Sequence, residues 1–263
     1  MRQPATRRLI LLALLVALGI GALFGQAIWA MRAHALRYAE STGANLAYAL
    51  QQSIGTLLRN LDTSLQGLAK DLENPQVMAL SPDLRNRVLF DYSLRAAGLS
   101  AVLVLDAQGR LLLDSAGSSA EEVDFSDRDY FRAFQSGGHQ GLFIGKPIRT
   151  RTTDRDCLPV SRAWFKKDGS FGGVVVGAIE LDYFHALFAA VQLGPKSSLN
   201  LYQTTGALVT RLPQRDADAG RNIAGSSNLA RITSSPRGTF TSRAVIDGVQ
   251  RLYTFQQVAD YPL

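Results

Sequence analysis

The chain has 263 residues, 46% hydrophobic and 19% charged, which is enough for one large domain or two small lobes with packed cores. Its single cysteine, Cys157, excludes a disulfide framework within the chain and every metal site built on several cysteines. Half of the net charge of +6 comes from three arginines near the N-terminus, Arg2, Arg7 and Arg8. The rest of the chain has 25 of the 28 basic residues against 22 acidic ones. No basic run is interleaved with aromatic residues, so the composition does not favour nucleic-acid binding.

The N-terminal segment carries the clearest signal. Residues 9–31 contain no charged side chain and are long enough to cross a bilayer, which needs about 20 apolar residues. The three arginines before them predict that residues 1–8 stay in the cytoplasm and that residues 32–263 lie outside, in the periplasm. A cleaved signal peptide is the alternative, but the one nearby Ala-x-Ala triplet, Ala33-His34-Ala35, lies beyond the apolar run. We therefore expect a retained helix in a bacterial inner membrane.

A long helix follows the predicted span. Apolar residues recur at steps of three and four from Leu46 to Leu72, which predicts a continuous stalk helix over residues 36–74 that Asn74-Pro75 ends. Its stripe can pack on its own domain, on a second copy of the chain, or on both. We favour packing on its own domain for most of its length.

A first α/β lobe is predicted over residues 75–193. Ser81-Pro82 begins a helix, and a second short helix runs from Arg128 to Phe134. Leu181–Val191 carries one apolar helix face. Short apolar segments separated by turn residues predict strands at 101–105, 110–113, 142–144, 158–165 and 173–179.

A second, smaller lobe is predicted over residues 194–263. A strand–turn–strand pattern around Gly206 repeats the one around Gly109 and places Leu208 on Leu111, which suggests two related lobes. Residues 238–245 and 250–258 form a further hairpin. We expect the native chain to continue beyond Leu263.

The sequence offers little to support catalysis. His34, His139 and His185 lie far apart and show no metal-ligand spacing, and neither a nucleophile elbow nor a phosphate-binding glycine loop is present. We expect no catalytic activity from this segment and neither a metal nor a cofactor. Cys157 is interpreted as an ordinary strand cysteine.

Five arginines deserve separate interpretation: Arg128, Arg149, Arg151, Arg155 and Arg162. Guanidinium groups suit carboxylates and phosphates. For Arg151 and Arg155 we favour solvent-exposed pairs with nearby aspartates. Arg128 begins a helix and Arg162 alternates with apolar residues on a strand, so each needs a partner, either in the protein or in a ligand.

The residues around these arginines resemble a known family, the double Cache (PDC-type) sensor domains, most closely those that precede diguanylate cyclase or histidine kinase modules. The resemblance covers residues 36–263. The motifs that carry it are Arg128-Asp129-Tyr130-Phe131, Gly145-Lys146-Pro147, Ser161-Arg162, Asp168-Gly169-Ser170-Phe171-Gly172-Gly173-Val174-Val175 and Leu181-Asp182-Tyr183-Phe184.

The resemblance implies an α/β (α+β) fold in which a long N-terminal helix carries two PAS-like lobes with antiparallel sheets. The lobe of residues 75–193 would be membrane-distal and that of residues 194–263 membrane-proximal. A second transmembrane helix and a cytoplasmic output module would follow.

The family also implies a ligand pocket in the distal lobe. Its amino-acid-binding members use an R-x-W-Y motif, of which Arg128 keeps the arginine, with Tyr130 and Phe131 in place of the aromatic pair. Where those members hold the ligand ammonium with aspartates, this chain has Thr150 and Ala178. The resemblance thus predicts a small anionic ligand without an α-amino group, and the predicted site residues are Arg128, Tyr130, Phe131, Arg149, Thr150 and Arg162.

The sequence therefore predicts the extracytoplasmic sensing domain of a membrane receptor that forms homodimers. Two alternatives stay open: a ligand-independent dimerisation or interaction module, and a membrane-anchored periplasmic hydrolase. The hydrolase is disfavoured, since no set of nucleophile, base and orienting residue is evident.

Overall fold

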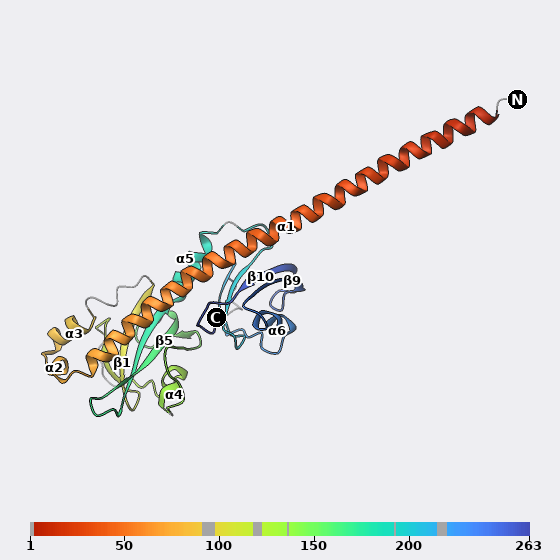
Figure 1. Ribbon diagram of the computed structural model, residues 1–263. Coiled ribbons are helices and arrows are strands. Elements are labelled where there is room, and N and C mark those ends of the chain that lie inside the picture. The colour runs from red at the N-terminus through yellow and green to blue at the C-terminus, as the bar shows by residue number, and fades with distance from the viewer. Residues whose placement is uncertain (1–2, 91–97, 118–122, 136, 192, 215–219) are drawn as a thin grey trace.

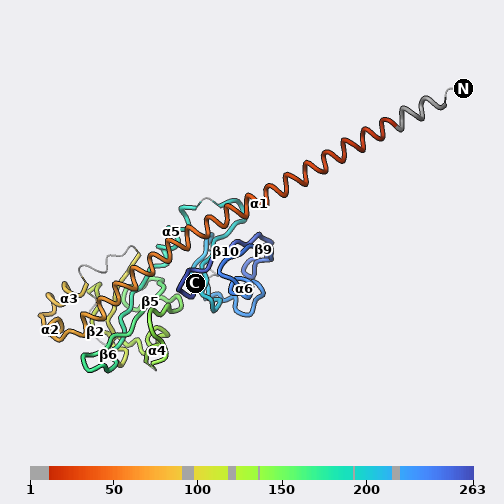
Figure 2. Tube along the Cα trace, in the orientation of Figure 1, coloured from red at the N-terminus to blue at the C-terminus, as the bar shows by residue number. Residues whose placement is uncertain are grey.

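In the computed structural model, two lobes lie along the C-terminal half of one very long helix, α1 (Gln3–Leu72), whose N-terminal half projects away from them (Figure 1). The structure describes residues 3–90, 98–117, 123–135, 137–191, 193–214 and 220–263. At 1.5 Å per residue, the 70 residues of α1 span about 105 Å. Figure 2 traces the same path from α1 through both lobes.

The projecting half of α1 is apolar and uncovered. The large side chains from Leu12 to Trp29 are exposed, and this part of the helix is long and apolar enough to cross a membrane, by length and composition alone. Exposed apolar side chains on all sides of a helix are unfavourable in water. A nonpolar environment around this segment would remove that cost.

The other half of α1 forms the spine of the core. From Ile54 to Leu72 its predicted apolar stripe is buried against the two lobes of the same chain, so these side chains are not free to form a dimer seam. The buried residues are Ile54, Leu57, Leu58, Leu61, Leu65, Leu68, Ala69 and Leu72. One continuous apolar cluster includes them together with residues of both lobes. The helix ends at Leu72, as predicted, and the side chain of Asn74 caps the short α2 (Pro75–Met78).

The distal lobe contains one antiparallel sheet of six strands in the order β2-β1-β6-β5-β3, with β4 also paired to β5. α1 and α5 (Leu181–Ala189) cover one face, and α4 (Asp129–Gln135) covers the other. α3 (Pro82–Phe90) begins at the predicted proline. The strands are β1 (Leu99–Asp106), β2 (Leu111–Asp114), β3 (Phe143–Ile144), β4 (Ile148–Arg149), β5 (Asp156–Phe165) and β6 (Phe171–Glu180).

The proximal lobe is built from two separate hairpins and a helix. β7 (Leu199–Tyr202) pairs with β8 (Leu208–Leu212), and β9 (Arg237–Arg243) pairs with β10 (Gln250–Gln256). α6 (Ser227–Thr233) lies between them in the sequence, with the hydroxyl of Ser226 capping it. Buried Gln203 joins the lobes, because its side-chain amide donates to the carbonyls of Ile144 and Gly145.

The two lobes repeat each other around the predicted glycines. Gly109 and Gly206 both have positive φ, at 86° and 91°. A Cβ on either would come within 2.8 Å or less of the backbone that follows the hairpin, so both turns require glycine. Equivalent backbone bonds surround them, pairing Gly109 N with Asp106 O and Phe125 N with Gly109 O in one lobe, and Gly206 N with Gln203 O and Ile223 N with Gly206 O in the other. The predicted repeat and the predicted α+β class are therefore confirmed.

Candidate functional site

The α4 face of the distal sheet is closed by aromatic side chains. Tyr130 and Phe131 of α4 are only 2% and 0% exposed. They pack with Phe125 and Phe134 over sheet residues that include Leu103 and Val176. The two predicted aromatic site residues thus belong to the core of this face, and a ligand could meet them only at its edge.

Arg128 stands at the entrance to α4. Its backbone N–H donates to the carbonyl of Phe125 at 3.0 Å. Its Nε is buried, and no hydrogen-bond acceptor for it is found in the described part of the chain. Burial raises the pKa of Tyr130, and the positive charge of Arg128 opposes that rise.

The neighbouring arginines are paired within the protein. Arg151 makes a two-pronged bond with Asp127 at 3.0 and 2.8 Å, and it also donates to the carbonyl of Asp124. The hydrogen bond from Arg151 lowers the pKa of Asp127. Arg155 pairs with Glu180 at 2.8 Å. The expected pair with an aspartate is confirmed for Arg151, whereas Arg155 was expected to pair with an aspartate and pairs with Glu180 instead.

Arg149 is the last residue of β4, and Thr150 follows it on the segment that leads to β5. The exposed guanidinium of Arg149 pairs with Asp154 at 2.7 Å and lies 3.7 Å from Asp156, so an anion would have to compete with two carboxylates for it. The hydroxyl of Thr150 lies 2.7 Å from that of Thr153. Neither residue is shown to face a ligand, and their role stays a prediction.

Arg162 requires a correction. It was expected to share a cavity with Arg128, Tyr130 and Phe131, but it lies on the opposite face of the sheet. Successive strand residues point to opposite faces, and Ser161 faces α4, donating to the carbonyl of Tyr130 at 3.2 Å. Arg162 therefore faces α1, where its guanidinium makes a two-pronged bond with Asp62, one contact being 3.0 Å.

One acidic residue on the α4 face was missed. Asp114, at the end of β2, is 7% exposed, and its Oδ2 is buried without a hydrogen-bond partner among the described residues. Its strand partner Leu103 belongs to the α4-side core, so Asp114 points the same way. The signal available in the sequence was an aspartate closing the apolar run Leu111–Leu113. Ala178 stands where the amino-acid-binding members carry an aspartate. It is buried on this same face of the sheet, opposite Ala101.

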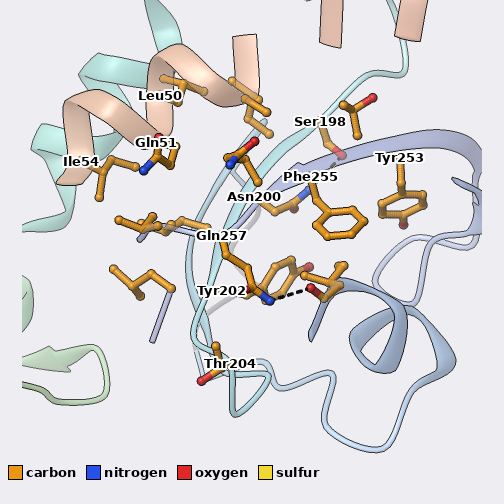
Figure 3. Close-up of a pocket in the computed structure, with 18 of the residues that line it drawn as sticks. Leu50, Gln51, Ile54, Ser198, Asn200, Tyr202, Thr204, Tyr253, Phe255 and Gln257 are labelled. Atoms are coloured by element: carbon orange, nitrogen blue, oxygen red, sulfur yellow. Dashed lines mark hydrogen bonds between the residues drawn. The ribbon is translucent and has the colours of Figure 1, made fainter. Parts of the chain in front are cut away.

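A pocket of about 190 Å³ lies elsewhere, in the proximal lobe. β7 and β10 form two of its walls, α1 contributes Leu50, Gln51 and Ile54, and α6 contributes Leu229 and Ile232 (Figure 3). None of the predicted site residues lines it. No sequence pattern indicated this pocket, because it depends on how the two hairpins are placed.

The remaining reactive groups are accounted for by packing. In the part of the chain that the structure describes, no group of three or more His, Cys, Asp or Glu residues could hold a metal ion. His139 packs edge-on against Phe134 and Phe143. Cys157 is buried in β5, and burial raises the pKa of its thiol to about 11, which disfavours the reactive thiolate.

Part of the sequence and the overall fold are similar to those of known proteins. Residues 181–263 match the family model described as dCache_1_like, histidine kinase sensor domain. The extracellular domain of rpHK1S-Z16, assigned as a histidine kinase, is 28% identical with a TM-score of 0.76, and the match covers 87% of this chain and 92% of that one. The chain is thus similar to the double Cache sensor domains, in sequence over residues 181–263 and in fold over most of its length. No curated protein matches it.

Two chemoreceptor ligand-binding domains share the fold of this chain. That of Pseudomonas fluorescens CtaA, in complex with L-isoleucine, has a TM-score of 0.62 at 19% identity, with 89% and 90% of the two chains covered. That of Campylobacter jejuni Tlp3, in complex with 4-methylisoleucine, has a TM-score of 0.58 at 15% identity, with 82% and 85% covered. Together with the family model and the rpHK1S-Z16 domain, these likenesses support an extracellular ligand-binding sensor domain of the histidine kinase or chemoreceptor type.

Proposed function

We propose that this domain binds a small anionic ligand in its distal lobe, at the edge of the α4 face beside Arg128. The observation that carries the proposal is the buried Nε of Arg128, which has no acceptor among the described residues. A buried donor left unpaired costs about 1–3 kcal/mol, and a bound carboxylate or phosphate oxygen would remove that cost.

The surroundings of Arg128 support an anion rather than an amino acid. Arg151 adds a second positive charge nearby, but Asp127 already neutralises it, so Arg128 is the cation left to attract a ligand. At the two positions where amino-acid-binding members carry an acid, Thr150 and Ala178 offer no charge to hold an ammonium group. A desolvated ammonium without a counter-charge would lose affinity.

A second candidate, a ligand that carries an amino group, is favoured by one observation. Among the described residues, the buried Oδ2 of Asp114 has no hydrogen-bond partner, and it lies on the same face of the sheet as Arg128. It could hold an ammonium in place of the missing acids. The CtaA and Tlp3 domains, whose structures contain amino acids, share this fold.

Thermal unfolding of the full chain in detergent with a metabolite panel tests both candidates. Simple carboxylates and dicarboxylates are expected to raise the melting temperature, and standard L-amino acids are not. A ligand at about 100 times its Kd stabilises by about 2.7 kcal/mol, or about 5–10 °C for a domain of this size. Tight binding of an ordinary L-amino acid that Asp114→Asn abolishes would instead establish the second candidate.

Substitution of the arginine ties the shift to the site. Arg128→Ala should weaken binding by about tenfold to a hundredfold, because a charge-assisted hydrogen bond contributes roughly 1.5–3 kcal/mol. Arg132→Ala, which removes an exposed arginine from the same helix, is the matched control and should leave the shift unchanged. Equal shifts in both variants would place the ligand elsewhere and contradict the proposal.

The remainder of the proposal concerns the whole receptor. Residues 9–31 anchor the domain in a bacterial inner membrane with residues 32–263 in the periplasm, which the exposed apolar half of α1 supports. The segment itself catalyses nothing and signals to a cytoplasmic sensor histidine kinase or diguanylate cyclase; the likeness to the rpHK1S-Z16 domain favours the kinase. The receptor works as a homodimer, with contacts outside the buried part of the α1 stripe.

A further inference from the structure

Gln203 is a residue of the proximal lobe whose side chain reaches into the distal lobe. It directly follows β7, and its backbone N–H donates to the carbonyl of Ala207 in the turn before β8. Its side chain is 5% exposed, and Nε2 donates to the carbonyls of Ile144 at 3.3 Å and Gly145 at 2.7 Å. Only the NH₂ end of a side-chain amide can donate to two carbonyls, so the orientation of this amide is fixed.

The equivalent residue of the distal lobe uses its side chain differently. The repeat places Asp106 where the proximal lobe has Gln203, at the start of the matching turn. The carboxylate of Asp106 stays inside its own turn, where it accepts from the N–H groups of Gln108 and Arg110. Gln203 has a longer side chain and directs it out of the turn. The bond between the lobes is therefore not a by-product of the repeated turn.

The segment that Gln203 holds is closely packed on the distal lobe. The N–H of Gly145 donates to the carbonyl of Pro159, in β5, at 2.9 Å. A Cβ on Gly145 would come within 2.8 Å of the ring of Pro159 and 3.0 Å of the carboxylate of Asp129. Gly145 thus lies between β5 and the first residue of α4, and its backbone cannot move far without displacing one of them.

Asp129 continues the connection to the ligand site. Its Oδ1 accepts from the N–H of Tyr130 at 2.8 Å, and its Oδ2 accepts from the N–H of Lys146 at 2.9 Å. One carboxylate therefore joins the first turn of α4 to the segment that Gln203 holds. The residue before Asp129 is Arg128, whose buried Nε carries the proposed function.

A single peptide group lies at the centre of this connection. The carbonyl of Gly145 and the N–H of Lys146 belong to one planar unit, which accepts from Gln203 and donates to Asp129. Hydrogen bonds at the two ends of a peptide group strengthen each other, because each polarises the group further. A rotation of this unit would weaken both bonds, so the side chain of Gln203 also restrains the carboxylate of Asp129.

We propose that Gln203, in the proximal lobe, is a positioning residue for the ligand site of the distal lobe. It acts through the Gly145–Lys146 peptide and Asp129, which hold the start of α4 and keep the guanidinium of Arg128 in the geometry that receives an anion. The inference rests on the proposed function of Arg128. Coupling between two places in a protein is reciprocal, so an anion bound at Arg128 would in turn strengthen the contact between the lobes.

Amide hydrogen exchange of the full chain in detergent tests this connection without a ligand. Gln203→Met keeps the length of the side chain and removes its donors. The amides of Tyr130 and Lys146, both bonded to Asp129, should then exchange about twofold to tenfold faster, as expected for the loss of about one hydrogen bond. The side-chain Nε–H resonance of Arg128, identified by its loss in Arg128→Ala, should shift.

Two control variants separate this role from a general loosening of the proximal lobe. Thr205→Ala changes the same turn but removes only a hydroxyl that lies 3.5 Å from Oε1 of Gln203. Asp247→Asn breaks the bond to Arg211, which lies at the opposite end of the β7–β8 hairpin. Both variants should leave the two amides and the Arg128 resonance unchanged. Equal changes in Asp247→Asn and Gln203→Met would overturn the proposal.

A titration with succinate, followed by the melting temperature, tests the effect on the ligand site. Gln203→Met should bind succinate about threefold to thirtyfold more weakly than the unmodified chain, and Thr205→Ala should bind it equally well. If neither succinate nor another carboxylate binds the unmodified chain, the proposed function fails. The exchange data then still decide whether Gln203 positions Arg128.

A double variant shows whether the two residues act through one connection. If Gln203 acts through Asp129, adding Gln203→Met to Asp129→Asn should change the Arg128 resonance and the exchange of Tyr130 little beyond the effect of Asp129→Asn alone. Fully additive effects would overturn the proposal. So would a folded Gln203→Met variant in which the Arg128 resonance and both amides are unchanged.

Discussion

At the scale of single residues, the Arg162–Asp62 pair shows how a charge on an apolar strand is stabilised. Both side chains are about one-fifth exposed, at 20% and 23%, and the contact joins β5 to α1. The sequence could show that Arg162 needed a partner, since an unpaired charge on an apolar strand is costly. It could not show which partner, because Asp62 is 100 residues away.

A double-mutant cycle on this pair should give a coupling of about 1–2 kcal/mol, since a two-pronged, partly shielded Arg–Asp pair exceeds a surface pair. Arg162→Ala, Asp62→Ala and the double variant would be measured by chemical unfolding. The Arg149–Asp154 pair, 61% and 81% exposed, is the control and should couple by about 0–1 kcal/mol. The Arg162→Ala variant should keep the ligand-induced rise in melting temperature. Loss of that rise in a variant that still folds would show that Arg162 belongs to the ligand site.

At the scale of elements, helices and turns were predictable because their signals are local. The apolar period fixed α1 as far as Leu72, and the alignment of Gly206 on Gly109 located two equivalent turns. The placement of β7 relative to β10, by contrast, has no local signal in the sequence. Each strand has a recognisable pattern, but nothing local determines whether two strands some 50 residues apart are neighbours or leave a gap.

The two proximal hairpins are joined by a buried ionic network. Asp247, in the β9–β10 turn, accepts from Arg211 of β8 at 2.7 Å and from Arg251 of β10 at 2.6 Å. The side chains of Asp247 and Arg211 are each 2% exposed. Hydrogen bonds from Arg251, and secondarily from Arg211, hold the pKa of Asp247 well below its usual value.

Asp247→Asn should therefore destabilise the chain at neutral pH, by roughly 3–5 kcal/mol, because the buried guanidinium of Arg211 and the mostly covered one of Arg251 each lose an ionic hydrogen bond. A carboxyl whose folded pKa is depressed contributes stability above its unfolded pKa and loses it as the pH falls toward the folded value. The difference in unfolding free energy between the two chains should thus shrink as the pH drops below 3.8. Urea unfolding between pH 7 and pH 3 measures it, and a difference that stays constant would contradict this account.

At the scale of the whole molecule, the structure joins two repeated lobes to one helix through a single apolar cluster. That cluster contains Leu58 of α1, Val160 of the distal lobe and Leu201 of the proximal lobe. A displacement in one lobe is therefore transmitted to α1 through packed side chains, which deform little. The sequence predicted this layout through its family resemblance, whereas the site itself was only partly predictable: Arg128 was found, Asp114 was missed, and Arg162 was assigned to the wrong face.

The orientation of the molecule across the membrane follows from its N-terminus. Arg2, Arg7 and Arg8 precede an uncharged segment whose exposed side chains from Leu12 to Trp29 are apolar, so the arginines should stay in the cytoplasm and both lobes should be exported. Reporters fused after Leu72 or after Gly194 should be active when they require the periplasm and inactive when they require the cytoplasm. Replacing the three arginines with glutamate should weaken this preference and so provides the control. Activity of a cytoplasmic reporter at either position in the unmodified chain would reverse the topology and remove the basis for an extracellular sensor.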